Sequence, residues 1–166
     1  MATQPCPCGF LGDMARACTC SQQAVARYQS RISGPILDRL DIHIEVPRLR
    51  QDDLLSTRSG ESSAAVRARV ASASRIQQQR FANVKGVTKN AQMRPRDMKQ
   101  FCPLSSEVQS LLRTAIDQLH LSARAYDRIL KLSRTIADLE ASEQIGPAHL
   151  AEAIQYRNLD RGIIRS

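Results

Sequence analysis

Residues 121–139 read LSARAYDRILKLSRTIADL, and this stretch decides the fold. Its apolar residues recur every three or four positions, which is the spacing of one face of an amphipathic helix. Ser122 stands just before the run and offers an N-cap, so the pattern predicts a helix over 123–141. The face that we expect to be buried consists of Tyr126, Ile129, Leu130, Ser133, Ile136 and Ala137.

The opposite face of this helix is basic. A turn of about 100° per residue places Arg124, Arg128 and Lys131 close together around the helix axis, beside Thr135. A run of charges along a helix is more often a hydrated face than a binding one. We therefore expect Arg128, Lys131 and the nearby Arg134 to face water.

Helical periodicity recurs on both sides of this stretch. Residues 61–82 and 105–119 repeat the same spacing, and Gly146 with Pro147 opens a last short helix that has Pro at its first position. The stripe on the first of these helices is short and consists of Val66, Val70, Ala73 and Ile76. Residues 84–96 contain turn formers, so we expect a connecting loop there with little to bury.

One segment alternates in the manner of a strand. Residues 41–46 alternate polar and apolar side chains and are followed by Pro47. Ile42, Ile44 and Val46 would then share one face of an extended chain. The pattern predicts one half-buried strand, the only convincing strand in the sequence.

The composition favours a helical protein with a polyanionic partner. Of 166 residues, 42% are apolar but only 4% are aromatic, so the core must be aliphatic and a large β-sandwich is disfavoured. The formal net charge of +8 favours nucleic acid, nucleotide phosphates or an acidic protein face. No apolar run is long enough for a membrane span or a signal peptide. We expect a cytoplasmic chain with reduced thiols and no membrane partner.

Four of the five cysteines stand near the N-terminus, as the pairs Cys6, Cys8 and Cys18, Cys20. Two such pairs, joined by a Gly-containing loop, could converge as four thiolates on one Zn²⁺ ion. The spacing is less diagnostic than paired C-x-x-C motifs. Reduced thiols packed as small apolar groups, or disulfides formed in the purified protein, remain equal alternatives. Cys102 has no partner in sequence and is expected to be a core or surface thiol.

Six short stretches follow one another along the chain: PCPCG at 5–9, RISGPILDRLD at 31–41, GESS at 60–63, LSARAYDRIL at 121–130, ADLE at 137–140 and HLAEAIQYR at 149–157. Together they resemble the magnesium-chelatase-like AAA+ ATPases, and among these the competence-associated ComM type. The resemblance implies the C-terminal third of such a protein. Residues 1–58 would end the α/β core, with the Cys-rich loop and the strand, and residues 59–166 would form the helical lid, which gives a mainly α fold.

The resemblance also implies nucleotide-sensing roles for two arginines. Arg39 matches the arginine finger, which reaches in trans the γ-phosphate bound by a neighbouring subunit, and Arg124 matches the sensor-2 arginine, which touches ATP phosphates in its own subunit. A guanidinium suits phosphoryl transfer because its permanent charge stabilises the equatorial oxygens. Taken alone, Arg39 could instead pair with Asp38 or Asp41, and Arg124 could be a solvated helix residue. Gln4 replaces the sensor-1 Asn of the family and is given no role.

The P-loop pattern G-x-x-x-x-G-K-[ST], which holds ATP and Mg²⁺, does not occur in these 166 residues. We therefore expect the chain to be inactive alone and to meet ATP and Mg²⁺ only in an intact hexameric ring, with full-length AAA+ subunits or copies of itself. The resemblance implies a DNA branch-migration helicase of natural transformation. Two alternatives remain: a non-catalytic basic helical module that binds nucleic acid or a partner protein, and an ATPase subunit for metal insertion, as in magnesium chelatase.

Basic side chains give a weak indication of nucleic-acid contact. The helix predicted at 61–82 is rich in arginine, Arg80 included, but has no aromatic residue between the charges. Any such contact should reach phosphates rather than bases. The candidates are Arg67, Arg69, Arg75, Arg128 and Lys131.

Overall fold

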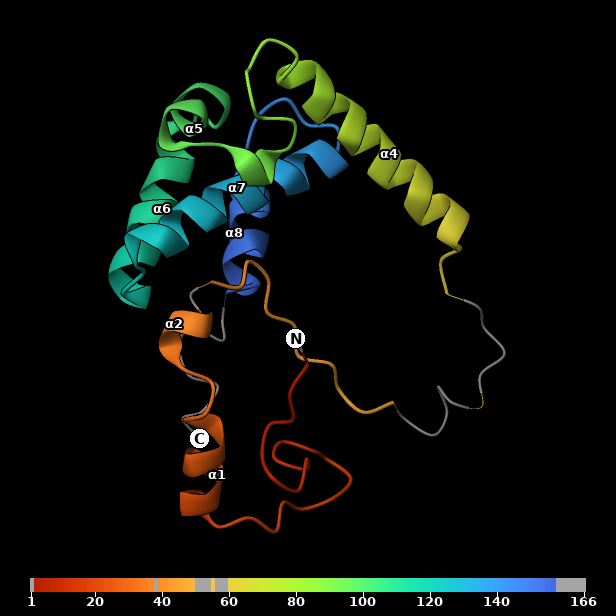
Figure 1. Ribbon diagram of the computed structural model, residues 1–166, viewed down its shortest axis with the longest axis vertical. Coiled ribbons are helices and arrows are strands. Elements are labelled where there is room, and N and C mark those ends of the chain that lie inside the picture. Colours follow the sequence, from red (N-terminus) through yellow and green to blue (C-terminus); the bar gives the residue numbers. More distant parts are fainter. Residues whose placement is uncertain (1, 38, 50–54, 56–59, 158–166) are drawn as a thin grey trace. The chain divides into compact units, whose positions relative to one another are not determined.

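The computed structural model describes residues 2–37, 39–49, 55 and 60–157. These residues divide into two compact units, an N-terminal unit up to residue 55 and a helical unit of residues 60–157 (Figure 1). The fold is mainly α, as predicted, and the described part of the chain contains no β-pairing beyond one isolated bridge between Leu104 and Ile145. None of the helices in these ranges is both long and apolar enough to cross a bilayer.

The helical unit is built around one central helix. Its elements are α4 (Ser63–Arg80), the 3-10 turn η1 (Asn90–Gln92), α5 (Pro95–Phe101), α6 (Ser106–Leu119), α7 (Ala123–Leu139) and α8 (Pro147–Gln155). Helix α7 packs against α8, α4, η1 and α5, and it runs through the middle of the unit (Figure 1). The helix predicted from the stretch that begins at Leu121 is therefore confirmed.

Serine caps fix where three of these helices begin. The side-chain oxygens of Ser62, Ser105 and Ser122 accept hydrogen bonds from the main-chain N–H three residues further on, at 3.2, 3.3 and 3.1 Å. Each bond satisfies one of the N–H groups that a helix leaves unpaired at its start, a contribution of about 1 kcal/mol.

The core of the helical unit is aliphatic. Val108 of α6, Ile129 of α7 and Leu150 of α8 are fully buried, and the rings of Phe81 and Phe101 meet edge to face at 5.2 Å. Burying one such aliphatic side chain stabilises the fold by about 1.5–3 kcal/mol. These side chains belong to one core, in which α8 packs against both α6 and α7.

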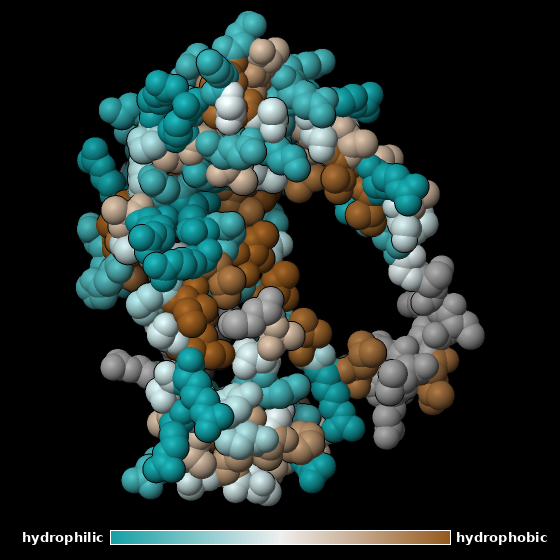
Figure 2. Space-filling view, viewed as in Figure 1, coloured by the Kyte–Doolittle hydropathy of each residue, from teal (hydrophilic) through white to brown (hydrophobic). Residues whose placement is uncertain are grey.

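Helix α4 is buried only near its C-terminal end. Ala73 is buried, whereas Val66 and Val70 are 38% and 51% exposed. The N-terminal half of α4 extends beyond the other helices of its unit (Figure 1), and Figure 2 shows brown apolar side chains among the teal ones along it. The predicted apolar stripe is therefore only half used within the described residues.

The expectation of a loop with little to bury at 84–96 was wrong. Val87 and Met93 are 2% exposed and Asn90 is 1% exposed, and the helix α5 starts at Pro95. The missed signal was the start of α5, where Pro95 takes the first position and Asp97 accepts a hydrogen bond from the main-chain N–H of Arg94 at 2.8 Å. That N–H also lowers the pKa of Asp97. Isolated buried residues such as Val87 and Met93 do not recur at a regular spacing, so a search for helical or strand periodicity does not detect them.

The strand predicted at 41–46 is also not formed in the described residues. Ile42, Ile44 and Val46 are 47%, 65% and 84% exposed, so the predicted inner face is open. His43, from the opposite face, is buried instead, with its Nε2 3.2 Å from the carbonyl oxygen of Leu37. Alternation identifies a strand only when neighbouring strands supply the hydrogen-bonding ladder.

The described residues of the N-terminal unit include the short helices α1 (Gln22–Gln29) and α2 (Gly34–Leu37). Helix α1 was not predicted, although Ser21 is a recognisable cap, because its residues have little apolar periodicity. The side-chain oxygen of Ser21 accepts from the main-chain N–H of Ala24 at 3.2 Å. Helix α2 begins at Gly34, directly before Pro35.

The C-terminal end of α7 predicts a stabilising substitution. Ala141 follows the cap residue Glu140 with φ +54°, and the N–H of Ser142 donates to the carbonyl oxygen of Ala137 at 2.8 Å. A residue with a Cβ is strained by about 1–2 kcal/mol in this left-handed conformation, which glycine adopts freely. We expect Ala141→Gly to raise the melting temperature of the helical unit by about 4 °C or more.

The matched control for this substitution is Ala151→Gly, at an exposed position inside α8. There the same change should lower stability by about 0.5–1 kcal/mol, because glycine loses more backbone freedom in a helix. Thermal unfolding followed by circular dichroism measures both. A loss of stability in both variants would contradict the proposed strain at Ala141.

Candidate metal centre and nucleotide-sensing arginines

The four N-terminal cysteines converge on one point and form what we call the thiol cluster (Cys6, Cys8, Cys18 and Cys20). Their Sγ atoms all lie within 4.8 Å of one another. The Sγ atom of Cys8 lies 3.4 Å from that of Cys6 and 3.5 Å from that of Cys18, and the Cys6–Cys18 separation is 3.6 Å. Four thiolates placed tetrahedrally at about 2.3 Å from a zinc ion lie about 3.8 Å apart. The three separations among Cys6, Cys8 and Cys18 thus lie within about 0.4 Å of the tetrahedral value, and Cys20 is near enough to supply the fourth ligand.

Two tight turns bring the closely spaced cysteines together. The N–H of Gly9 donates to the carbonyl oxygen of Cys6 at 3.0 Å, and Gly9 has φ +81°. The next turn runs from Phe10 to Asp13 and contains Gly12 at φ +83°. A Cβ at Gly9 would also lie 3.3 Å from Oε1 of Gln4. The first turn bends the chain sharply enough for ligands two residues apart to share one ion.

The electrostatics of the thiol cluster are uneven. The main-chain N–H groups of Phe10 and Thr19 lower the pKa of Cys8 to about 5. The N–H of Cys20 lowers the pKa of Cys18, but burial and the neighbouring sulfurs outweigh it and raise that pKa to about 12. Like charges in contact cannot all ionise without a cation between them. A divalent cation would stabilise the four thiolates together.

Cys102, the remaining cysteine, lies apart from the thiol cluster in sequence and in its surroundings. It is 6% exposed in the core of the helical unit, and burial raises the pKa of its thiol to about 11. Of the two alternatives left open by the sequence, it is a core thiol, and it remains protonated near neutral pH.

Arg39 is exposed and follows the short helix α2. Its Nη1 donates to the carbonyl oxygen of Pro35 at 2.9 Å, which anchors one side of the guanidinium on the helix. The alternative ion pair with Asp38 concerns a residue outside the described ranges. An exposed guanidinium held by a main-chain carbonyl is chemically suited to meet an anion from another molecule.

Arg124 is exposed at the second position of α7. The N-terminus of a helix carries a partial positive charge, so a cation there is unfavourable and an anion is favourable. The first turn of α7 contains no acidic residue. The combined field of the helix and of Arg124 therefore attracts anions. Arg39 and Arg124 belong to different units of the chain.

The other candidates for nucleic-acid contact differ in whether their charged groups already have partners within the protein. Arg69 forms a two-pronged ion pair with Glu61 at 2.8 and 3.0 Å, and Nζ of Lys131 donates to the carbonyl oxygen of Ala91 at 3.1 Å. Arg67 and Arg75 are exposed on α4. Arg128 is half-buried on α7.

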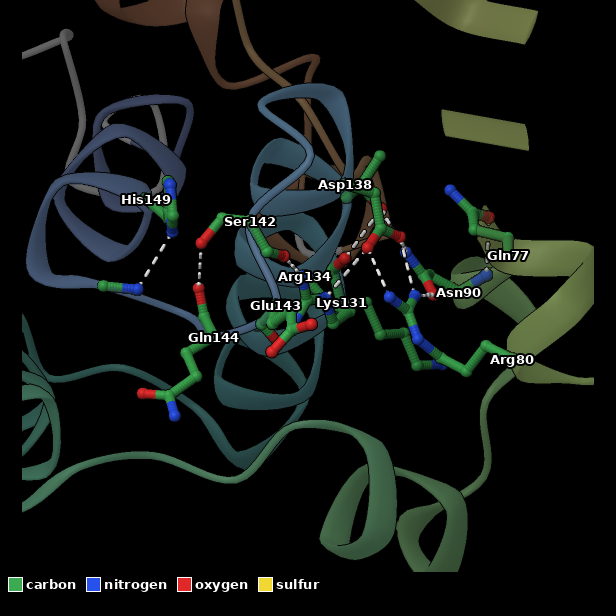
Figure 3. A network of polar contacts seen from close by, with 12 residues as sticks. Gln77, Arg80, Asn90, Lys131, Arg134, Asp138, Ser142, Glu143, Gln144 and His149 are labelled. Atoms are coloured by element: carbon green, nitrogen blue, oxygen red, sulfur yellow. Dashed lines mark hydrogen bonds and ion pairs between the residues drawn. The ribbon is translucent and has the colours of Figure 1, made fainter. Parts of the chain in front are cut away.

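The expectation that Arg134 faces water was wrong. Arg134 is 2% exposed, its Nε donates to Asp138 at 3.1 Å, and its Nη1 donates to the carbonyl oxygen of Glu143 at 2.8 Å (Figure 3). Burial lowers the pKa of this guanidinium, while Asp138 opposes that effect. The guanidinium of Arg134 therefore binds the buried carboxylate of Asp138 on α7 and the main-chain carbonyls of the loop that follows α7.

Asp138 is the centre of a buried network that the sequence did not predict. It also accepts hydrogen bonds from Nη1 of Arg80 at 2.6 Å and from Nδ2 of Asn90 at 2.7 Å (Figure 3). The network thus joins α4, η1 and α7. Arg80, which the sequence placed on a basic helix, is committed to this contact, and its side chain is 15% exposed. The only signal was the Arg134–Asp138 spacing of four residues, which is common on exposed helix faces.

Comparison with known proteins places these features in a family. The family model described as "Magnesium chelatase, subunit ChlI C-terminal" matches residues 60–157, and "Magnesium chelatase, subunit ChlI" matches residues 1–54. "Competence protein ComM" of Haemophilus influenzae is 43% identical over 162 residues, which cover 96% of this chain and 30% of that protein.

Two further relatives carry the name "Uncharacterized protein YifB". The protein of Escherichia coli is 40% identical over 166 residues, and that of Salmonella typhimurium is 39% identical over 166 residues; both matches cover 98% of this chain and 31% of the relative. The chain thus spans about a third of the length of the curated relatives it matches.

Proposed function

The chain belongs to the magnesium chelatase subunit ChlI C-terminal family, and from this premise we propose that it is the C-terminal segment of a ring-forming AAA+ ATPase of the ComM type. Residues 1–58 would end the α/β core and residues 59–166 would form the lid. The observation that carries the proposal is the match to Competence protein ComM over 96% of the chain. The exposure of Arg39 and Arg124 supports it.

In this proposal Arg39 acts in trans and Arg124 acts in cis. The guanidinium of Arg39 would reach the γ-phosphate bound by the adjacent subunit and stabilise the charge that builds on its oxygens during transfer. Arg124, at the positive end of α7, would hold the phosphates of ATP in its own subunit. Bound ATP and Mg²⁺ supply the phosphoryl group and its charge neutralisation. Arg39 and Arg124 of this chain would bind the phosphates of ATP and position them for transfer.

The second proposed cofactor is a zinc ion bound by the thiol cluster. We propose that its four thiolates hold one Zn²⁺ ion, since their mutual distances fit a tetrahedral site. Like the ring ATPase, this centre would operate in the cytoplasm, where reducing conditions keep thiols available as ligands.

The first test of the proposal is that the 166-residue chain does not turn over ATP. No P-loop pattern occurs in its sequence, so these 166 residues lack the loop that binds the triphosphate which Arg39 and Arg124 would contact. Phosphate release from ATP and Mg²⁺ should remain at the level of the buffer blank, in preparations whose helical content is native by circular dichroism. Hydrolysis proportional to the amount of this chain, and retained through successive purification steps, would overturn this division of labour.

We further propose that DNA is the substrate on which the ring acts, by branch migration during natural transformation. The net charge of +8 and the exposed Arg67 and Arg75 on α4 support contact with a polyanion. The same observation favours the second candidate function, a non-catalytic module that binds nucleic acid or a protein. Metal insertion, as in magnesium chelatase, is the third candidate.

Salt-dependent DNA binding tests the contact with DNA that the first two candidates share. Removing a side chain that neutralises one phosphate should flatten the slope of log affinity against log salt by about 1. We expect Arg67→Gln and Arg75→Gln each to have this effect, and Arg69→Gln, whose guanidinium is paired with Glu61, to have less of it. Fluorescence anisotropy with a labelled branched duplex measures the slopes. Absence of binding at low salt, or equal slopes for all three variants, would contradict a DNA contact through α4.

A further inference from the structure

We propose that the metal ion in the thiol cluster is a structural centre that folds the N-terminal unit and thereby fixes the segment that carries Arg39. This inference rests on the zinc site proposed above and assigns its role. It does not depend on whether the ring acts on DNA.

The ligand set is that of a closed site. All four Sγ atoms lie within 4.8 Å of one another, and a tetrahedral ion that binds four thiolates has no position left for water or substrate. Cys6 is fully buried, which shields the centre from solvent on that side. Four sulfur ligands in a tetrahedron select zinc or iron over the oxygen-preferring cations magnesium and calcium. Such a centre stabilises a fold rather than catalysing a reaction.

Within the 166-residue chain, the N-terminal unit has a minimal core of its own. Among its described residues, Cys6 is the one apolar side chain that is buried, and the other two buried side chains are Gln29 and His43. Units of this size without an apolar core rely on disulfides or metals for their stability. The thiol cluster is the one group of cysteines that the unit offers for this purpose.

Hydrogen bonds connect residues next to the thiol cluster with both ends of α1. Cys20 is followed by Ser21, whose side chain caps the start of α1. At the other end of α1, Nε2 of Gln29 donates to the carbonyl oxygen of Pro5 at 3.0 Å, directly before Cys6. Both ends of α1 are thus tied to residues that flank metal ligands.

The chain beyond α1 returns to the same loop. Arg48, in the extended segment after Arg39, lies 3.7 Å from the carboxylate of Asp13 in the Cys-rich loop. The Asp13 carboxylate also accepts from the N–H of Ala15 at 2.7 Å, which orders the loop itself. Residues on both sides of Arg39 are therefore connected to the thiol cluster, and loss of the metal should release them together.

The experiment uses the 166-residue chain, purified with reductant. We expect about one equivalent of zinc by metal analysis. Replacement by Co²⁺ should give the visible bands of a tetrahedral ion and the near-ultraviolet sulfur-to-metal charge transfer of thiolate ligands. Removing the metal with a chelator should speed amide exchange by about tenfold or more at the hydrogen-bonded amides of α1 and α2 and at those of Arg39 and Leu40, while residues 60–157 keep their protection.

Matched variants test the coupling separately from metal binding. Cys8→Ser and Cys20→Ser should each lose the cobalt spectrum and the protection of α1, whereas Cys102→Ser, in the core of the helical unit, should keep both. Gln29→Ala should keep the cobalt spectrum but lose protection in the last turn of α1, because it removes only the bond to Pro5.

Three results would overturn the inference. They are a reduced chain without metal, disulfides within the thiol cluster in its place, or an N-terminal unit equally protected with and without the ion. None of these outcomes touches the trans role of Arg39 in ATP turnover. Conversely, an intact metal centre in a ring that ignores Arg39 would overturn the proposed function and leave this inference standing.

Discussion

Replacing Arg39 by Ala in the assembled, P-loop-bearing ring should lower ATP turnover by about 10³–10⁵-fold. The guanidinium is exposed and anchored through Nη1 to Pro35, so the substitution removes a charge without disturbing a buried contact. An interaction made mainly in the transition state changes the rate and leaves ground-state binding nearly intact. ATP affinity, measured with a fluorescent nucleotide, should therefore change little.

Two comparison variants make this result specific to Arg39. Arg39→Lys keeps the charge but not the planar fork, so it should restore only part of the turnover. Arg124→Ala should instead weaken ATP binding, because we place Arg124 against the phosphates of its own subunit in the bound state. Equal kinetic defects in the two alanine variants would contradict the separate roles.

Replacing Asp138 by Ala should destabilise the helical unit by about 3–5 kcal/mol. Asp138 has no exposed side-chain surface and faces two guanidinium groups, those of Arg80 and Arg134, whose side chains are 15% and 2% exposed. Removing the carboxylate leaves both cations with no counter-charge in the network and breaks the bond to Asn90. A loss of this size approaches the whole stability of a typical domain.

Urea unfolding of the 166-residue chain measures this effect, with Asp117→Ala on the exposed face of α6 as the control. The control should change stability by no more than about 0.5 kcal/mol. If Asp138→Ala fails to fold, Asp138→Asn, which preserves shape and one acceptor, should give a measurable intermediate loss. A loss below about 1 kcal/mol for Asp138→Ala would show that the network does not hold α4 and η1 on α7.

The elements predicted correctly are those with a local signal. Residues 123–141 carry both a serine cap and a full apolar face, and α7 forms there as Ala123–Leu139. The paired cysteines likewise indicated a possible metal site, although the spacing did not show that the four sulfurs would lie within 4.8 Å. That closeness depends on the turn at Gly9, whose positive φ is a property of the folded loop.

The errors arose where distant residues decide the outcome. Arg134 was placed in water because its neighbours on α7 are charged, but besides Asp138 on the same helix its partners are carbonyls beyond the helix, those of Ser142 and Glu143. Single buried anchors such as Val87 have no period to detect. The strand at 41–46 has a clear alternation but no neighbouring strand in the described residues. In each case, burial or strand pairing depends on residues that are distant in the sequence, so a local pattern could not predict it.

The most direct measurement of the central claim is a subunit-mixing assay. Rings of Arg39→Ala subunits and rings of subunits that lack the P-loop lysine should each be nearly inactive. After subunit exchange, verified with labelled protein, some interfaces combine an intact P-loop from one subunit with Arg39 from its neighbour. ATP turnover should then reappear in the mixture, because Arg39 acts across the interface. A mixture as inactive as its components would contradict the account.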